Sequence, residues 1–206
     1  MKIVYDVSMT IEPKMQVYKN REHLRPEFIT TAEHDKQGLH QTRVCLDLHT
    51  GTHLDAPLHM VPDGATIDDY PLEEMLVPCQ VFDLTHVHER ITAADIEDLS
   101  IEPGKFVLFR TKNSEKEELG EDFVYVDLTA ARTLVSKRVV GVGVDALGIE
   151  RDQAGHMTHR ILFQAGIKIL EGLCLGHVPP GSYTLLVAPL KFQGVEAALV
   201  RALLLE

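Results

Sequence analysis

Apolar residues occur in this chain mainly as short runs that glycine, proline or charged residues interrupt. The most continuous run, Val139-Val-Gly-Val-Gly-Val-Asp145, is rich in β-branched residues and predicts a strand that is buried on both faces. Shorter apolar runs predict further strands by the same reasoning. These strands span residues 2–8, 79–84, 105–110, 167–170, 181–188 and 195–205.

Between these runs, three segments carry the pattern or the end signals of helices. Residues 92–99 begin with Thr92, whose side chain is suited to cap a helix, and have acidic residues in the first turn. Residues 127–136 follow a helical pattern. Residues 158–165 predict a short helix that Gly166 would end in the left-handed conformation.

Polar segments separate these elements. Residues 19–36 are polar and predict either a long surface segment or a strand that faces solvent. Residues 112–121 contain a charge run and predict an exposed loop. His86 and His88 follow a predicted strand without an acidic partner at ligand spacing, so we expect them at the surface.

Length and composition are those of one globular domain that spans residues 1–206. Of the 206 residues, 45% are hydrophobic and 25% are charged, which is enough apolar material for a real core. The formal net charge of −11 argues against nucleic acid or an anionic membrane surface as a partner. The N-terminus has no apolar signal core, and no stretch approaches the ~20 apolar residues of a membrane span.

Three cysteines, Cys45, Cys79 and Cys174, leave one over and do not resemble a secreted disulfide framework. We therefore expect a reduced, cytoplasmic setting. Cys45 lies close to the densest cluster of polar residues, which raises the question of a thiolate ligand or nucleophile. Its neighbours Val44 and Leu46 favour ordinary packing instead.

The stretch Asp47-Leu-His-Thr-Gly-Thr-His-Leu-Asp-Ala-Pro-Leu-His59 concentrates side chains that bind metals or move protons. A helix would turn Asp55 away from the histidines, and an extended chain places His49, Gly51, His53 and Asp55 on one face. The glycine would leave room for an ion there. Pro57 would then bend the chain and bring the last histidine in from another direction. Buried, hydrogen-bonded histidines at a strand edge are the alternative, and four such residues at this spacing favour metal binding.

The segment from His49 to His59 resembles the HxGTHxDxPxH signature of the cyclase-like metal hydrolases, a family that includes bacterial kynurenine formamidase and isatin hydrolase. The resemblance implies a mixed α/β domain with a swivelling β/β/α core, a mixed sheet flanked by helices, and a homodimer or larger homo-oligomer. The apolar runs and the helices between them agree with that architecture.

The resemblance also gives roles to residues that the sequence alone leaves unremarkable. His159 and Glu171 match the family's later metal-binding histidine and glutamate, with His156 as a competitor of His159. Tyr18 matches an aromatic residue that lines the substrate pocket, although Gln16-Val-Tyr-Lys-Asn20 departs from the family's Pro-Val-Trp-Pro-Gly-Asp-like run, and a packing role for Tyr18 stays open. Asp145 is interpreted as structural.

Carried over position by position, the resemblance implies two zinc ions per subunit, with manganese or iron as alternatives. One ion would bind His49, His53, Asp55 and Glu171, and the second would bind Asp55, His159 and Glu171. A bound zinc ion lowers the pKa of water from about 15.7 to about 7. The expected reaction is hydrolysis of an aryl amide, first of all N-formyl-L-kynurenine of tryptophan catabolism, with His59 as the catalytic residue that moves a proton to the leaving nitrogen.

Three alternatives remain open from the sequence. The first keeps the hydrolase and changes the substrate to isatin or another cyclic amide. The second takes His49, His53 and Asp55 as two histidines and a carboxylate that hold iron for an oxygenase, which would leave His159 and Glu171 without a role. The third is a non-catalytic metal-binding protein, against which the absence of a thiolate cage argues.

Overall fold

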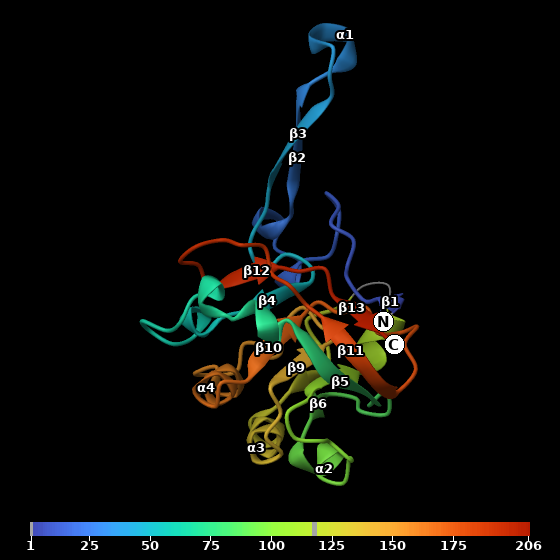
Figure 1. Ribbon diagram of the computed structural model, residues 1–206, viewed down its shortest axis with the longest axis vertical. Coiled ribbons are helices and arrows are strands. Elements are labelled where there is room, and N and C mark those ends of the chain that lie inside the picture. Colours follow the sequence, from blue (N-terminus) through green and yellow to red (C-terminus); the bar gives the residue numbers. More distant parts are fainter. Residues whose placement is uncertain (1, 117–118) are drawn as a thin grey trace.

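The structure, a computed structural model, describes residues 2–116 and 119–206. Nine strands form one mixed sheet in the order β1-β13-β11-β5-β7-β9-β10-β4-β12 (Figure 1). Strands β5, β7, β9 and β10 are parallel, and the remaining pairs are antiparallel. The strands are β1 (Ile3–Asp6), β4 (His53–Asp55), β5 (Leu76–Asp83), β7 (Phe106–Arg110), β9 (Gly141–Val144), β10 (Lys168–Glu171), β11 (Gly181–Leu186), β12 (Ala197–Leu199) and β13 (Leu203–Leu205).

The sheet is curled, because β12 and β13 are separated by three residues yet lie near opposite ends of the strand order. Within the connection, the amide of Val200 donates to Thr52 O at 3.1 Å. The carbonyl of Ala202 accepts from Val7 N at 3.0 Å. The single strand predicted over residues 195–205 is therefore wrong, and the apolar run forms two strands that join the two sides of the curl.

Three helices flank one side of the sheet, α2 (Ala93–Ile96), α3 (Leu128–Ser136) and α4 (Met157–Gln164) (Figure 1). All three match predicted segments. Thr92 forms a capping box with Asp95, and Gly166 follows α4 with φ +72°. Six short 3-10 helices add further regular structure among the described residues. They are η1 (Tyr18–Asn20), η2 (Glu22–Leu24), η3 (Pro57–His59), η4 (Ile67–Asp69), η5 (Leu72–Glu74) and η6 (Lys112–Glu115).

Both faces of the central strands are buried, which explains their almost continuous apolar sequences. On β7, Val107 and Phe109 face the core under the helices, and Phe106 and Leu108 face the core inside the curl. Strand β9 uses glycine on the second face, where a Cβ on Gly141 would lie 2.1 Å from the Phe106 ring. The large side chains of one strand thus fill the space that the glycines of its neighbour leave.

The polar region before the motif forms an arm that projects far from the rest of the molecule (Figure 1). The arm consists of β2 (Glu27–Ala32), α1 (His34–Gln37) and β3 (Gln41–Cys45). Strands β2 and β3 pair only with each other within the described chain. The predicted solvent-facing strand is confirmed, but the packing expected for Cys45 is wrong, because every residue of β3 is exposed.

Two further predictions concern loops. His86 and His88 are exposed, as expected. The exposed loop predicted over 112–121 is partly wrong, since Asn113 is buried and bonds both the carbonyl and the amide of Val124; residues 117 and 118 lie outside the described residues. A two-stranded ladder of β6 (Arg90–Ile91) and β8 (Tyr125–Val126) has no apolar pattern of its own and was not predicted. Among the described residues, no helix has the length and apolar character needed to span a bilayer.

Candidate metal centre

Strand β4 places two of the predicted ligands at the centre of the site. It lies between β10 and β12, and its three residues are buried. His53 and Asp55 share one face, because side chains alternate along a strand. Glu171 of β10 is the antiparallel partner of His53, so its carboxylate lies beside that imidazole. Side chains from distant parts of the sequence are thus brought together by strand pairing.

The extended conformation predicted from His49 to Asp55 is only partly confirmed. His49 lies in a turn, and Gly51 has φ +71°, a conformation that glycine adopts readily. Gly51 also leaves no room for an ion. A Cβ there would lie 2.5 Å from Ile11 and 3.3 Å from Met15, so the glycine makes space for the N-terminal segment. The turn nevertheless returns His49 to within 3.1 Å of Asp55.

The first group of ligand atoms has the spacing of a small metal polyhedron. Nε2 of His53 lies 3.1 Å from Nδ1 of His49, 3.3 Å from Oδ1 of Asp55 and 3.4 Å from Oε2 of Glu171. Ligands about 2.0–2.1 Å from a tetrahedral zinc ion lie roughly 3.3 Å from one another. Nδ1 of His53 lies 2.9 Å from the Gly51 carbonyl, a contact that leaves Nε2 free to bind a metal when Nδ1 donates to it.

A second group uses the other oxygen of each carboxylate. Nε2 of His159 lies 3.5 Å from Oε1 of Glu171 and 3.8 Å from Oδ2 of Asp55. Each carboxylate therefore presents one oxygen to the histidines of β4 and its preceding turn and the other to the histidine of α4. This division is what two bridging carboxylates require in a site with two metal ions.

Asp55 carries the clearest sign that the site is built for a cation. Its side chain is completely buried, and neither oxygen has a hydrogen-bond donor within the described part of the chain. Burial opposes its ionisation, but His53 and His49 hold the pKa of its carboxyl well below the usual range. A buried carboxylate without donors is costly unless it is paired or coordinates a metal, so the residues present fit such an ion.

Glu150 is a site residue that the sequence analysis missed. Its Oε2 accepts a short hydrogen bond from Nδ1 of His159, and its Oε1 accepts from Thr158 N at 2.9 Å. The carboxylate thereby fixes both the first turn of α4 and the orientation of the imidazole. Burial opposes the positive charge on His159, but the carboxylates of Glu150 and Glu171 raise its pKa to about 10. Only the carboxylate-histidine pairing typical of metal sites could have indicated Glu150 from sequence.

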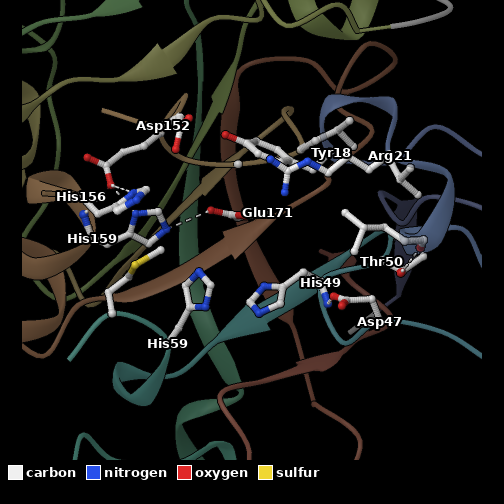
Figure 2. Close-up of a pocket in the computed structure, with 16 residues that line it drawn as sticks. Tyr18, Arg21, Asp47, His49, Thr50, His59, Asp152, His156, His159 and Glu171 are labelled. Carbon is white, nitrogen blue, oxygen red and sulfur yellow. Dashed lines mark hydrogen bonds and ion pairs between the residues drawn. The ribbon is translucent and has the colours of Figure 1, made fainter. Parts of the chain in front are cut away.

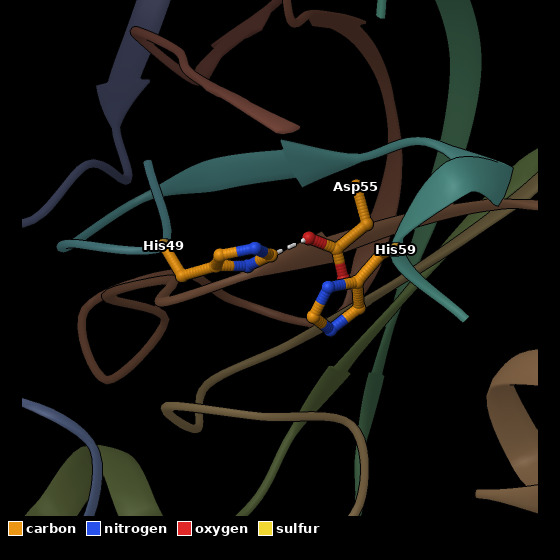
Figure 3. A group of neighbouring side chains, drawn as sticks. All are labelled: His49, Asp55 and His59. Carbon is orange, nitrogen blue, oxygen red and sulfur yellow. Dashed lines mark ion pairs between the residues drawn. The ribbon is translucent and has the colours of Figure 1, made fainter. Parts of the chain in front are cut away.

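His59 approaches from η3, which Pro57 begins, so the predicted bend is present. Its ring centroid lies 4.2 Å from that of His49 and 5.6 Å from that of His159. Burial lowers the pKa of His59, which favours the neutral form that can accept a proton. Ligand atoms of His49, Asp55 and His59 also lie within 4.8 Å of one another, so the geometry permits a ligand role as well (Figure 3).

His156 is placed differently from His159. It precedes α4 in a left-handed conformation, with φ +47°, and its Nδ1 lies 3.7 Å from Oε2 of Glu150. It belongs to a further group of three with Glu150 and His159. Asp145, which was interpreted as structural, is buried and accepts hydrogen bonds from Thr111 and Ser114.

A pocket of about 330 Å³ opens onto the cluster (Figure 2). This volume lies in the range of small-molecule sites. Tyr18 lines it together with His49, His59, His159 and Glu171. The ring of Tyr18 also packs edge-on against Phe123, with centroids 6.3 Å apart, so both roles considered for this tyrosine are structurally compatible.

The model of the Cyclase family, described as "Putative cyclase", matches residues 5–151. The chain belongs to the Cyclase family. This cyclase-family chain is 32% identical to kynurenine formamidase of Salinibacter ruber, over 97% of its own length and 95% of the relative's. The mixed α/β fold and the metal-hydrolase family predicted from the sequence are thereby confirmed.

Solved structures of other members agree. A protein described as a potential metal-dependent hydrolase with cyclase activity is 50% identical, with a TM-score of 0.91 over 97% of this chain and 96% of that chain. Isatin hydrolase A from Labrenzia aggregata, bound to benzyl benzoate, is 26% identical with a TM-score of 0.82. That alignment covers 98% of this cyclase-family chain and 93% of the isatin hydrolase. The relatives therefore include hydrolases with two different named substrates.

Proposed function

We propose that this protein is a metal-dependent arylformamidase that hydrolyses N-formyl-L-kynurenine to L-kynurenine and formate, a step of tryptophan catabolism. The observation that carries the proposal is the convergence of His49, His53, Asp55, His159 and Glu171 in one cluster, in a chain that resembles kynurenine formamidase over almost its whole length. Three of these residues, His49, His159 and Glu171, line the pocket. The division of carboxylate oxygens between two groups of histidines supports two ions per subunit.

We assign one ion to His49, His53, Asp55 and Glu171, and the second to Asp55, His159 and Glu171. Zinc suits these nitrogen and oxygen donors, as do manganese and iron. When bound, such ions supply an activated water and polarise a carbonyl oxygen. Burial disfavours the charged form of His53, but Asp55 and Glu171 raise its pKa well above the usual value. Metal binding would compete with protonation of that imidazole.

The remaining pocket residues would act on the substrate. His59 lies beside the cluster, and we assign it the transfer of a proton to the departing aniline nitrogen. Tyr18 offers an aromatic surface on the opposite side of the pocket for the aryl ring (Figure 2). Glu150 would hold His159 in the tautomer and orientation that a metal requires.

The deciding experiment measures formate release from N-formyl-L-kynurenine by metal-loaded protein and by the same protein after chelation. We expect chelator-sensitive turnover with kcat of about 1 per second or more. Ring opening of isatin is assayed in parallel, since the likeness to isatin hydrolase A supports that second substrate. Rapid isatin hydrolysis without formate release would replace the proposed substrate and retain the metal hydrolase.

We also propose that two copies associate through the arm. Phe28, Leu39 and Val44 expose 41%, 48% and 43% of their surface on an arm whose strands pair only with each other among the described residues. Two-stranded hairpins are marginally stable alone, so this arm needs a surface to pack on. A second copy is the partner that is always present. Both ends of the arm lead to the pocket, with η1 and η2 before β2 and Asp47 after β3.

Sedimentation velocity tests the association. We expect a dimer for the natural protein and monomers for Phe28→Asp combined with Val44→Asp. Leu72→Asp is the matched control, because Leu72 is 71% exposed on the body of the molecule. A dimer that survives both arm substitutions would contradict this mode of association.

A further inference from the structure

The pocket contains a cation that the metal site does not use. Arg21 lines the pocket and is its only lysine or arginine among the described residues. Asp47, Glu150, Asp152 and Glu171 also line it. In a chain with a net charge of −11, a single guanidinium among so many carboxylates is unexpected unless it has a specific task.

Arg21 is free to meet a ligand. Within residues 2–116 and 119–206, its guanidinium forms no ion pair and no side-chain hydrogen bond. Asp152, another charged residue of the pocket wall, pairs with Lys19 at 2.6 Å. In Figure 2 the side chain of Arg21 reaches from the Tyr18 segment into the pocket, toward Glu171 and His49. A ligand at the metal cluster can therefore extend to this arginine.

The backbone that presents Arg21 is unusual. Lys19 and Asn20 both have φ of 50°, in the left-handed region that residues other than glycine seldom adopt. Two such residues in succession reverse the chain between Tyr18 and Arg21, so that both side chains line the same pocket. Strained backbone of this kind persists where the surrounding structure requires it and is concentrated at ligand sites.

We infer that Arg21 binds the carboxylate of an aryl-amide substrate that carries an amino-acid arm, while the amide lies at the metal cluster. This inference rests on the proposed function, since it takes the cluster as the place of amide hydrolysis. A guanidinium presents two parallel donors that match a carboxylate, which gives recognition by direction as well as by charge. The site would thus select aryl formamides with a carboxylate over neutral ones.

The test compares two substrates that share the reacting group. N-formyl-L-kynurenine has an amino-acid arm with a carboxylate and an ammonium, and 2-formamidoacetophenone has the same aryl formamide and ketone without that arm. We expect Arg21→Ala to raise KM for the first about 10- to 100-fold with kcat nearly constant, and to leave KM for the second unchanged. For N-formyl-L-kynurenine, the KM of Arg21→Lys should lie between those of the natural protein and Arg21→Ala, because lysine keeps the charge and loses the two parallel donors.

Lys14→Ala is the matched control, since it removes one exposed cation outside this pocket and changes the net charge equally. Lys14→Ala should leave KM unchanged for both substrates. Equal effects of Arg21→Ala on both substrates, or no effect on either, would overturn the inference.

A binding measurement separates this inference from the proposed function. Calorimetry on metal-loaded protein compares L-kynurenine with 2-aminoacetophenone, which lacks the charged arm. If formate release is absent but L-kynurenine binds more tightly and Arg21→Ala removes the difference, the proposed function fails and the carboxylate site stands. If the natural protein binds the two ligands equally, or binds neither, the carboxylate site is refuted whatever the activity.

Discussion

Strand β4 and the arm of β2 and β3 are neighbours in the sequence with opposite surroundings. Strand β4 has three residues, all buried, with a paired strand at each edge. The arm has two longer strands that pair only with each other, and every residue of β3 is exposed. Burial fixes the side chains of β4 in place, so ligand positions are preorganised. The arm has no such constraint among the described residues.

This contrast predicts that changes in the buried strand alter chemistry by orders of magnitude. Asp55→Asn removes the charge shared by both groups of ligands while it keeps the size of the side chain. We expect loss of bound metal and a fall in formate release on the order of 1000-fold, because a catalytic metal contributes several kcal/mol to the transition state. Elemental analysis and the formate assay measure the two effects.

Asp63→Asn is the control, since Asp63 is exposed with φ of 56°, which asparagine tolerates. Full metal content in Asp55→Asn would refute the assignment of Asp55.

His59→Ala tests a residue that lies beside the cluster instead of within β4. We expect kcat to fall about 100-fold or more while metal content stays constant, because a positioned proton donor contributes roughly 10²–10⁴-fold. His88→Ala, at an exposed histidine, should retain full activity. Loss of metal from His59→Ala would instead assign His59 as a ligand, in the group with His49 and Asp55.

Glu150→Gln tests whether Glu150 acts by orienting His159 and not by binding a metal itself. The glutamine keeps a carbonyl acceptor for His159 but loses the charge, and we expect metal affinity to fall about 10- to 100-fold. Glu196→Gln provides the comparison, because Oε1 of Glu196 lies 3.7 Å from Nε2 of His49 and the side chain is partly exposed. Competition with a chromogenic chelator measures both affinities. An equal loss of metal affinity in the two variants would contradict a specific role of the buried Glu150 in orienting His159.

The smallest expected effect is a difference in alkylation rate between a buried thiol of the sheet and an exposed thiol of the arm. Burial raises the pKa of Cys79 in β5 to about 12, so its reactive thiolate is negligible at pH 8. Cys45 of the arm is exposed. We expect an alkylating reagent to label Cys45 within minutes and to leave Cys79 unmodified until the protein unfolds, with no change in activity. Peptide mass spectrometry identifies the sites, and early labelling of Cys79 would show that β5 opens readily.

The sequence predicts the central strands well because both of their faces are buried. An apolar run such as 139–144 has no competing structure, since no amphipathic helix fits it. Strand pairing is harder, because it depends on partners far along the chain. The run 195–205 looks like one strand, and only the curl of the sheet shows why it must be two. The ladder of β6 and β8 has two residues per strand, too few for any periodicity.

In the site, too, local sequence predicts what depends on neighbouring residues and misses what depends on residues far along the chain. The motif from His49 to His59 predicts a metal cluster because its residue types are dense and specific. The role given to Gly51 is wrong because the atoms that fill its space come from Ile11 and Met15, about forty positions earlier. Glu150 was missed because nothing in its local sequence marks it, and its partner His159 is brought to it by the start of α4.

The strand order also determines how late in protein synthesis the site can be completed. Leu199 of β12 pairs with His53, 146 positions earlier from 199 back to 53. At synthesis rates of about 5–20 residues per second, roughly 7–30 s pass between the two residues on the ribosome. During that interval β4 lacks β12, and until Lys168–Glu171 has been made it lacks β10 as well. The nascent chain thus presents its histidines and aspartate before the strands that align them are all present, so the complete cluster forms only at the end of folding.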